Sequence, residues 1–126
     1  MTAQLIDGKL IAQQVRDEVA AKVAKRIAAG KSKPTLAAVL VGERVDSATY
    51  VRAKGKACEE LGMGSVSHHL SEDISQDELE KLIKDLNADK SVNGILVQLP
   101  LPDHLNEERV LQLISIEKDV DGFSPL

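Results

Sequence analysis

A short, uninterrupted apolar segment at residues 35–41 constrains the fold of this chain more than any other feature. The segment lies between Pro34 and Gly42 and carries no polar side chain after Thr35. Such a run does not alternate between a buried and a solvated face, and this is typical of a strand covered on both faces. Strands of that kind occur in parallel sheets, where helices pack on either side. The segment therefore predicts a parallel sheet.

Helical periodicity and further apolar runs alternate along the rest of the chain. In chain order, we expect helices at about residues 9–29 and 47–61, a third helix that begins after Ser75, and a last helix at 107–114. Further strands are expected near residues 65–70 and 94–99. Ser75 and Glu78 form a capping-box pattern, and Gly30 and Gly62 supply stop signals for the first two helices. The order predicts an α/β fold: an open, mostly parallel sheet with helices on both faces, in three α/β/α layers.

Length and composition fit one domain that acts on a small molecule. A chain of 126 residues can bury a sizeable core, and that core must be aliphatic, because the sequence holds one Phe, one Tyr and no Trp. The net charge of −4 is spread over interspersed acidic and basic residues, so we expect no nucleic-acid partner. The apolar runs are too short to cross a bilayer, so we expect no membrane span.

Cysteine usage points to a reducing compartment. Cys58 has no second cysteine with which to form an internal disulfide, and the amino-terminus shows no signal segment. We therefore expect a cytoplasmic protein. Cys58 itself is interpreted as a small core residue, with a place beside a site as the alternative.

Tyr50 and Lys54 lie four residues apart in the second predicted helix, so their side chains share one face. Two interpretations stay open for Lys54. It is either a solvated lysine on an amphipathic helix or an amine that acts as a base or hydrogen-bond donor in a site.

Polar residues follow the predicted strands at the sheet edge where ligands collect in open α/β sheets. Gln98 ends an apolar strand and precedes two prolines, at 100 and 102, that stop the strand. It is either a structural amide or a side chain presented to a ligand. Asp119 and Asp121 precede Gly122 in what is either a surface turn or a loop whose carboxylates accept hydrogen bonds from a heterocycle.

Metal and dinucleotide sites find no support in the sequence. His68 and His69 are adjacent on a predicted strand, so they point to opposite faces and cannot both bind one metal ion. No glycine-rich turn opens a helix after a strand, and no phosphate-binding loop ending in Lys-Ser or Lys-Thr occurs. We expect no metal and no dinucleotide cradle in these residues.

Several ordered blocks of the sequence resemble the bifunctional methylenetetrahydrofolate dehydrogenase/methenyltetrahydrofolate cyclohydrolase family. The blocks are Leu5-Ile-Asp-Gly-Lys9, Val41-Gly42, Ser47-x-x-Tyr50-Val-x-x-Lys54-x-Lys56-x-Cys58-x-x-x-Gly62, Gly94-Ile-Leu-Val-Gln-Leu-Pro-Leu-Pro102 and Lys118-Asp-Val-Asp-Gly122. Together they cover essentially the whole chain. Each block alone is a weak signal, but their order is specific.

The resemblance implies an activity and a division of the chain. The family oxidises 5,10-methylenetetrahydrofolate to 5,10-methenyltetrahydrofolate with NADP and hydrolyses the product to 10-formyltetrahydrofolate, in one-carbon metabolism. Residues 1–118 would form the folate-binding catalytic domain and residues 119–126 the start of an interdomain linker. The NADP-binding Rossmann domain of the family would lie outside this chain. We expect a homodimer of the full-length enzyme.

The same resemblance implies roles for seven residues. Lys54 would be the catalytic lysine, Gln98 the partner that positions and tunes it, and Asp121 the acceptor for the pterin ring. Tyr50 would stack on the aminobenzoyl part of the folate. The expected lining residues are Ser47, Val97 and Leu99.

Two other functions compete with this one. The chain could be a folate-binding module without activity, since the cofactor domain is missing from it. Short-chain dehydrogenases also use a Tyr-x-x-x-Lys pair, but in that family a glycine-rich nucleotide turn comes first and the pair much later. Here the pair lies at residues 50–54 with no such turn before it, and this context argues against that family.

Overall fold

Helices and strands alternate through residues 8–120, the part of the chain that the computed structural model describes. The elements are α1 (Gly8–Ala28), β1 (Thr35–Val41), α2 (Val45–Glu60), β2 (Gly64–Leu70), α3 (Gln76–Ala88), β3 (Gly94–Val97), α4 (Glu107–Leu113) and a 3-10 turn, η1 (Ile116–Lys118). This order confirms the predicted alternation.

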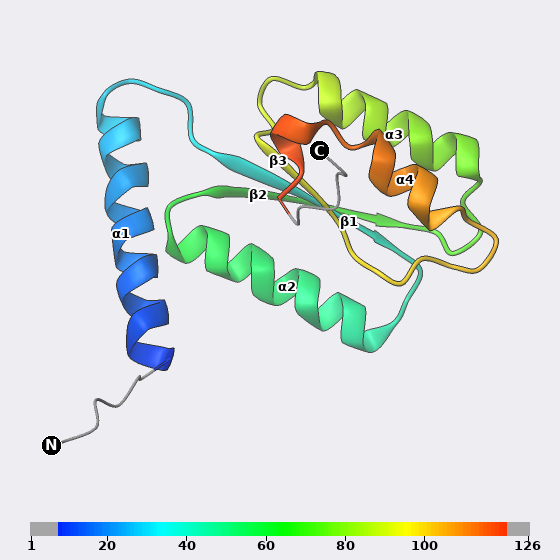
Figure 1. Ribbon diagram of the computed structural model, residues 1–126, viewed down its shortest axis with the longest axis horizontal. Helices are drawn as coiled ribbons and strands as arrows, with labels where there is room; N and C mark the ends of the chain where they lie inside the picture. The colour runs from blue at the N-terminus through cyan, green and yellow to red at the C-terminus, as the bar shows by residue number, and fades with distance from the viewer. Residues whose placement is uncertain (1–7, 121–126) are drawn as a thin grey trace, which may run out of the picture.

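The three strands form one parallel sheet with β1 in the middle, in the order β2-β1-β3. Helix α2 lies on one face of the sheet, and α3 and α4 lie on the other (Figure 1). The fold is therefore the predicted three-layer α/β/α arrangement. Since β1 is followed by a helix on one face and β3 by a helix on the other, the carboxyl ends of β1 and β3 flank a topological switch point, where ligands bind in such sheets.

Alternate side chains of β1 enter two different cores. Ala37, Val39 and Val41 pack towards α3 and α4 with the fully buried Leu79 and Ile83. On the opposite face, a smaller cluster combines β1, β3 and α2, and its members are Ala38, Leu40, Val51 and Leu96. The strand is apolar throughout because both of its faces are buried, as its sequence predicts.

The helix boundaries reflect local capping. The Ser75 hydroxyl accepts a hydrogen bond from the Glu78 N–H at 3.2 Å, so Ser75 caps α3 as expected. Gly62 has a φ of +80°, the left-handed conformation that ends α2. Helix α2 begins at Val45, two residues earlier than predicted.

The carboxyl-terminal part departs from prediction in two places. Strand β3 ends at Val97, not at residue 99, because the prolines that follow remove backbone donors from the ladder. The Gln98 N–H still donates to the Val39 carbonyl at 2.9 Å. Residues 116–118 form η1, and Asp119 bridges to Ile95 beside β3 where a loop was expected.

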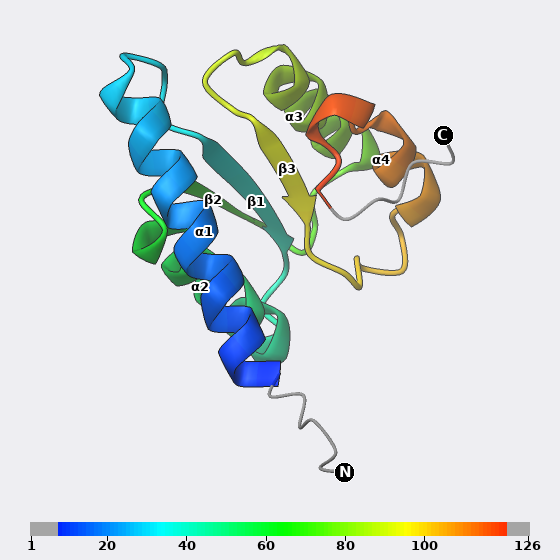
Figure 2. The ribbon, with the colours of Figure 1, turned by 60° about the vertical axis from the view of Figure 1, so that its left-hand side comes forward.

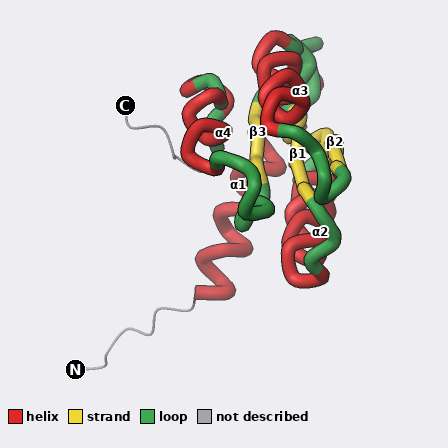
Figure 3. Tube along the Cα trace, turned by 90° about the vertical axis from the view of Figure 1, so that its right-hand side faces the viewer, coloured by secondary structure: helices red, strands yellow, loops and turns green. Residues whose placement is uncertain are grey.

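Helix α1 is less embedded than its periodicity suggests. Among its residues, all of them described, only Val23 is buried. Ile11 and Val15, on the predicted apolar stripe, are 48% and 52% exposed. The carboxyl-terminal half of α1 lies against the end of α2, where Val23 is near Gly62, and the amino-terminal half projects away from the sheet (Figures 2 and 3). Apolar residues on one face of α1 are therefore not all buried, because only the carboxyl-terminal part of that face packs against another element.

Candidate functional site

The side chains of Lys54 and Gln98 meet at the carboxyl edge of the sheet. Lys54 Nζ donates a hydrogen bond to Gln98 Oε1 at 3.2 Å, across 44 positions of sequence. Lys54 lies on α2, which follows β1, and Gln98 is the residue directly after β3. The two residues therefore lie on opposite sides of the switch point. Both side chains are half-buried. The structure thus joins a lysine of the second predicted helix to the glutamine predicted at this edge, the pair that the family resemblance implies.

Backbone contacts fix which end of the Gln98 amide faces the lysine. The amide Nε2 donates to the Leu99 carbonyl at 3.3 Å, and the backbone N–H donates to the Val39 carbonyl at 2.9 Å. The amide oxygen is left to accept from Lys54. An amine held in this way has a defined position and a defined hydrogen-bond acceptor.

Tyr50 and Ser47 lie on α2, within two turns before Lys54. Tyr50 is 59% exposed, so a face of its ring is open to a planar ligand. Ser47 is only 3% exposed, and its N–H donates to the side chain of Asp46. The two residues therefore differ in accessibility, and Tyr50 is the more available for contact with a ligand.

The remaining predicted site residues divide between the core, its border and the undescribed tail. Val97 is 2% exposed and packs in the core beneath α3 and α4, so its side chain is not exposed at the edge of the sheet. Leu99 is partly buried against the same core. Asp121 lies outside the described residues. Asp119 is inside them and adjoins β3.

The turn between β1 and α2 is held at Gly42. Its φ is +86°, a conformation that only glycine adopts without strain. The Gly42 N–H donates to the Leu70 carbonyl at 3.0 Å, and the Gly42 carbonyl lies 2.6 Å from His69 Nε2. A carbonyl only accepts, so Nε2 is the protonated nitrogen of this ring. His69 therefore has a structural contact with the turn that leads into α2.

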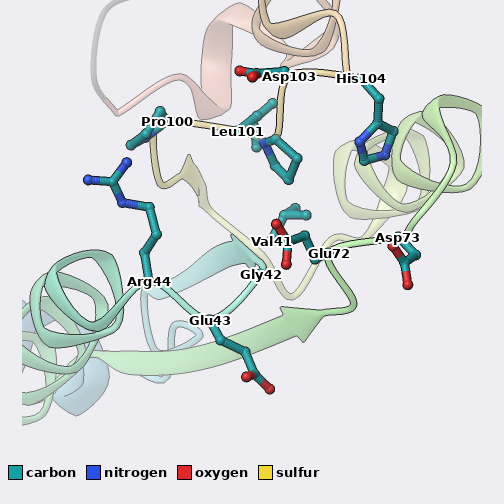
Figure 4. Close-up of a pocket in the computed structure, with 11 residues that line it drawn as sticks. Val41, Gly42, Glu43, Arg44, Glu72, Asp73, Pro100, Leu101, Asp103 and His104 are labelled. Carbon is teal, nitrogen blue, oxygen red and sulfur yellow. The ribbon is translucent and has the colours of Figure 1, made fainter.

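A cavity of about 600 Å³ opens beside this turn. Figure 4 shows Arg44 and Pro100 on one side of it, Asp73 and His104 on the other, and Val41 with Gly42 between them. The full lining is Val41, Gly42, Glu43, Arg44, Glu72, Asp73, Pro100, Leu101, Pro102, Asp103 and His104. The cavity shares the segment after Gln98 with the lysine site but contains neither Lys54 nor Tyr50.

Several groups near the site have shifted pKa values. A hydrogen bond from the Arg44 guanidinium lowers the pKa of the Asp46 carboxyl below its usual value. This pair spans 3.0 Å but both side chains are more than half exposed, so it contributes little to stability. Burial raises the pKa of the Cys58 thiol, which is 8% exposed, so Cys58 is a protonated core residue near neutral pH.

The described residues contain neither a metal-binding cluster nor a membrane-spanning helix. Between residues 8 and 120, no three His, Cys, Asp or Glu side chains gather in a group that could hold a metal ion. His68 and His69 pair with Val39 and Leu40, which belong to opposite faces of the sheet. No helix in the same range is both long and apolar enough to span a bilayer.

Sequence reasoning missed the wall of the cavity that lies towards α3. Glu72 and Asp73 follow β2, and His104 lies in the loop before α4, where its Nε2 is 2.8 Å from the Ile74 carbonyl. The signal was present, because these loops also follow carboxyl ends of strands, as the Gly42 turn does. Glu72 and Asp73 were not predicted as site residues because β2, which they follow, has no long apolar run that marks it as a covered strand.

Known proteins resemble this chain over nearly its whole length. The family model of the tetrahydrofolate dehydrogenase/cyclohydrolase catalytic domain matches residues 6–121. The bifunctional methylenetetrahydrofolate dehydrogenase/cyclohydrolase FolD from Campylobacter jejuni is 48% identical, with a TM-score of 0.92, over 97% of this chain and 43% of its own.

Two eukaryotic structures show the same relationship. A 5,10-methylenetetrahydrofolate dehydrogenase from the silkworm Bombyx mori is 41% identical, with a TM-score of 0.91, over 98% of this chain and 42% of its own. The Trypanosoma brucei dehydrogenase-cyclohydrolase, solved with NADP cofactor and an inhibitor, is 36% identical, with a TM-score of 0.84, over 94% of this chain and 41% of its own. The chain thus spans about two fifths of the length of these proteins.

Proposed function

Because the chain belongs to the tetrahydrofolate dehydrogenase/cyclohydrolase family, we propose that it supplies the folate site and the catalytic lysine of a bifunctional enzyme. The enzyme oxidises 5,10-methylenetetrahydrofolate to 5,10-methenyltetrahydrofolate with NADP and hydrolyses that product to 10-formyltetrahydrofolate. Residues 1–118 form the folate-binding catalytic domain in this proposal, and residues 119–126 begin an interdomain linker.

The contact between Lys54 and Gln98 is the observation that carries the proposal. The hydrogen bond of 3.2 Å places a basic group at the switch point of the sheet and gives it a fixed orientation. A solvated lysine on a helix face needs no such partner from a distant strand. The contact therefore favours the catalytic interpretation of Lys54 over the surface interpretation.

The cyclohydrolase step can be assigned to these two side chains. Water adds to the methenyl carbon, which is electron-poor because it lies between two nitrogens in a cationic amidinium. The neutral Lys54 amine takes a proton from that water, and the new oxygen–carbon bond forms. The new hydroxyl group then gives up its proton as the carbon–oxygen double bond forms, the bond from this carbon to N5 breaks, and N5 gains a proton, leaving the formyl group on N10. One proton of the water thus ends on N5, and the other is released from Lys54 to solvent. Gln98 keeps the amine lone pair directed at the water by accepting one amine N–H.

Other residues bind the substrate. The exposed ring of Tyr50 stacks on the aminobenzoyl group, and Asp121 accepts hydrogen bonds from the pterin. Ser47, Val97 and Leu99 line the site, Val97 through its backbone because its side chain is in the core.

The dehydrogenase step needs an acceptor for the hydride, and NADP would supply that chemistry when bound. The 126 residues of this chain contain no glycine-rich dinucleotide turn, so we assign NADP binding to a separate carboxyl-terminal Rossmann domain. We also propose that the enzyme is cytoplasmic and that its full-length form is a homodimer. The homodimer rests on the family resemblance, and the cytoplasmic location rests on the single cysteine and the expected lack of a signal segment.

The test compares two lysines of α2 in the protein as its gene encodes it. Lys54→Met keeps the length of the side chain and removes the amine. It should lower the rate at which 5,10-methenyltetrahydrofolate absorbance disappears by about 10² to 10⁴-fold, the usual contribution of a general base. Lys56→Met makes the same change at an exposed position of the same helix and should leave the rate unchanged.

Folate binding separates catalysis from a binding-only module. Normal turnover in Lys54→Met would remove Lys54 from the mechanism. If the wild-type protein binds the substrate with no turnover above buffer, the module interpretation replaces the enzymatic one. Thermal unfolding of each variant shows whether the fold is intact.

A further inference from the structure

The segment after Gln98 has very few backbone hydrogen-bond donors. Pro100 and Pro102 have no N–H, so Leu101 supplies the one backbone donor of residues 100–102. Leu101 is 6% exposed, and a donor buried to that degree needs a partner. The Leu101 N–H donates to Glu107 Oε2 at 3.0 Å. Glu107 therefore binds the one backbone donor of this proline-rich segment, while at its far end the Pro102 carbonyl accepts from the Leu105 N–H at 3.0 Å.

This segment determines where the Gln98 amide lies. Gln98 Nε2 donates to the Leu99 carbonyl, and Leu99 is two residues before Leu101. A shift of the backbone at Leu101 moves the Leu99 carbonyl and turns the amide whose oxygen accepts from Lys54. A continuous path of hydrogen bonds and backbone thus runs from Glu107 to the amine.

Glu107 itself stands on a fixed support. It is the first residue of α4, where a carboxylate is favoured by the helix dipole. The Asn106 N–H donates to Gln76 Oε1 at 2.8 Å, and Arg109 forms a 2.9 Å ion pair with Glu80 on α3. Since α3 is anchored in the main core, the start of α4 has little freedom to follow a displaced loop.

We infer that Glu107 is a positioning residue for the reaction: it holds the segment at residues 99–101 so that the Gln98 amide oxygen meets the Lys54 amine. This inference rests on the proposed function of Lys54 and Gln98. Glu107 acts through the backbone of Leu101 and touches neither the lysine nor the substrate. Its role is therefore to set the rate of the lysine-dependent step, with little effect on folate binding by Tyr50.

The principal experiment compares two neighbouring glutamates in the protein as its gene encodes it. Glu107→Ala should lower the cyclohydrolase kcat by about tenfold, the effect of one lost hydrogen bond to a buried donor, with KM unchanged within about twofold. Glu107→Gln keeps an acceptor oxygen and should restore most of the rate. Glu108→Ala removes a carboxylate from the same turn of α4, at an exposed residue, and should change neither constant.

A double variant tests whether Glu107 acts through Gln98. In the Gln98→Ala background, Glu107→Ala should cause little additional loss, because the group that it positions is gone. Losses that multiply in the double variant would overturn the inference. The inference would also be overturned if the wild type is active and Glu107→Ala has the same kcat as Glu108→Ala. That outcome would leave the proposed function of Lys54 and Gln98 intact.

Hydrogen exchange gives a measurement that does not depend on turnover. The Leu101 amide should exchange about tenfold or more faster in Glu107→Ala than in the wild type, and at the wild-type rate in Glu108→Ala. If Glu107→Ala does not fold, Glu107→Asp keeps the charge at the start of the helix but is one methylene too short to reach, and it should show the same faster exchange. Unchanged exchange at Leu101 would overturn the inference whatever the activity.

Discussion

Replacing Gln98 by glutamate changes the charge beside the lysine and preserves the shape of the side chain. At the 3.2 Å between Lys54 Nζ and Gln98 Oε1, two unit charges attract by about 5 kcal/mol at an effective dielectric constant of about 20 and by about 1 kcal/mol in bulk water. Both side chains are half-buried, so we take an intermediate value of about 2 kcal/mol. A carboxylate at position 98 would stabilise the charged amine by that amount.

The loss of activity follows from the role given to the amine. If Lys54 must be neutral to take a proton from water, about 2 kcal/mol of added stabilisation lowers the cyclohydrolase rate at neutral pH by roughly 30-fold. The rate should recover as the pH is raised, because the amine then loses its proton despite the carboxylate. The assay is the loss of 5,10-methenyltetrahydrofolate absorbance at a series of pH values, corrected for the uncatalysed reaction.

Two further variants isolate the cause. Gln14→Glu introduces the same carboxylate at an exposed position of α1 and should leave the pH profile unchanged. Gln98→Asn shortens the side chain without adding charge, so its rate should fall without recovering at high pH. A Gln98→Glu enzyme with the wild-type rate and profile would refute the argument that a neutral Lys54 is the base.

Three other predictions concern stability. Gly42→Ala should lower the free energy of unfolding by about 1–2 kcal/mol in urea, because φ is +86° there, whereas Gly8→Ala, with no atom within 4 Å of the added methyl group, should be close to neutral. Ile83→Ala removes a side chain that is 0% exposed and should cost about 2–5 kcal/mol by the same measurement, so a loss below about 1 kcal/mol would contradict its place in the core. Burial raises the pKa of Glu80, but the Gln76 amide and the Arg109 charge outweigh it and leave that pKa below its ordinary value. The stabilisation is therefore full at neutral pH and lost as the pH falls through the folded-state pKa, and Arg109→Ala should flatten the decline in stability below about pH 5.

The sheet and its layers were predictable because apolar runs report burial directly. The strand at residues 35–41 was found with its observed bounds, since Pro34 and Gly42 limit it and every side chain after Thr35 is apolar. The strand that ends at Val97 was placed two residues too long, because Leu99 continues the apolar pattern while Pro100 removes the backbone donor that pairing needs.

Burial partners and side-chain contacts were less accessible to sequence reasoning. Periodicity put Ile11 and Val15 on one stripe of α1, but it contains no information on what packs against that stripe, and both are about half exposed. The residue pattern placed Gln98 at an edge of the sheet and Lys54 on a helix face, and only the family resemblance paired the two. Their hydrogen bond depends on the strand order, which decides that β3 and not β2 faces the lysine. Glu107 was not singled out because its partner is a backbone N–H, and no side-chain pattern signals such a contact.

The central place of β1 has a consequence for how the chain folds. Of the three strands, β1 is synthesised first, and both strands that pair with it come later in the chain. The core between β1 and α3 contains residues from Ala37 to Ile114. One face of β1 can be covered once α2 and β2 have emerged, whereas the other stays open until β3 and α4 arrive. Contacts so distant in sequence form slowly, because a long loop must close first. The pairing of Lys54 with Gln98 must await the docking of β3, so the pair that we propose to be catalytic forms at a late stage of folding.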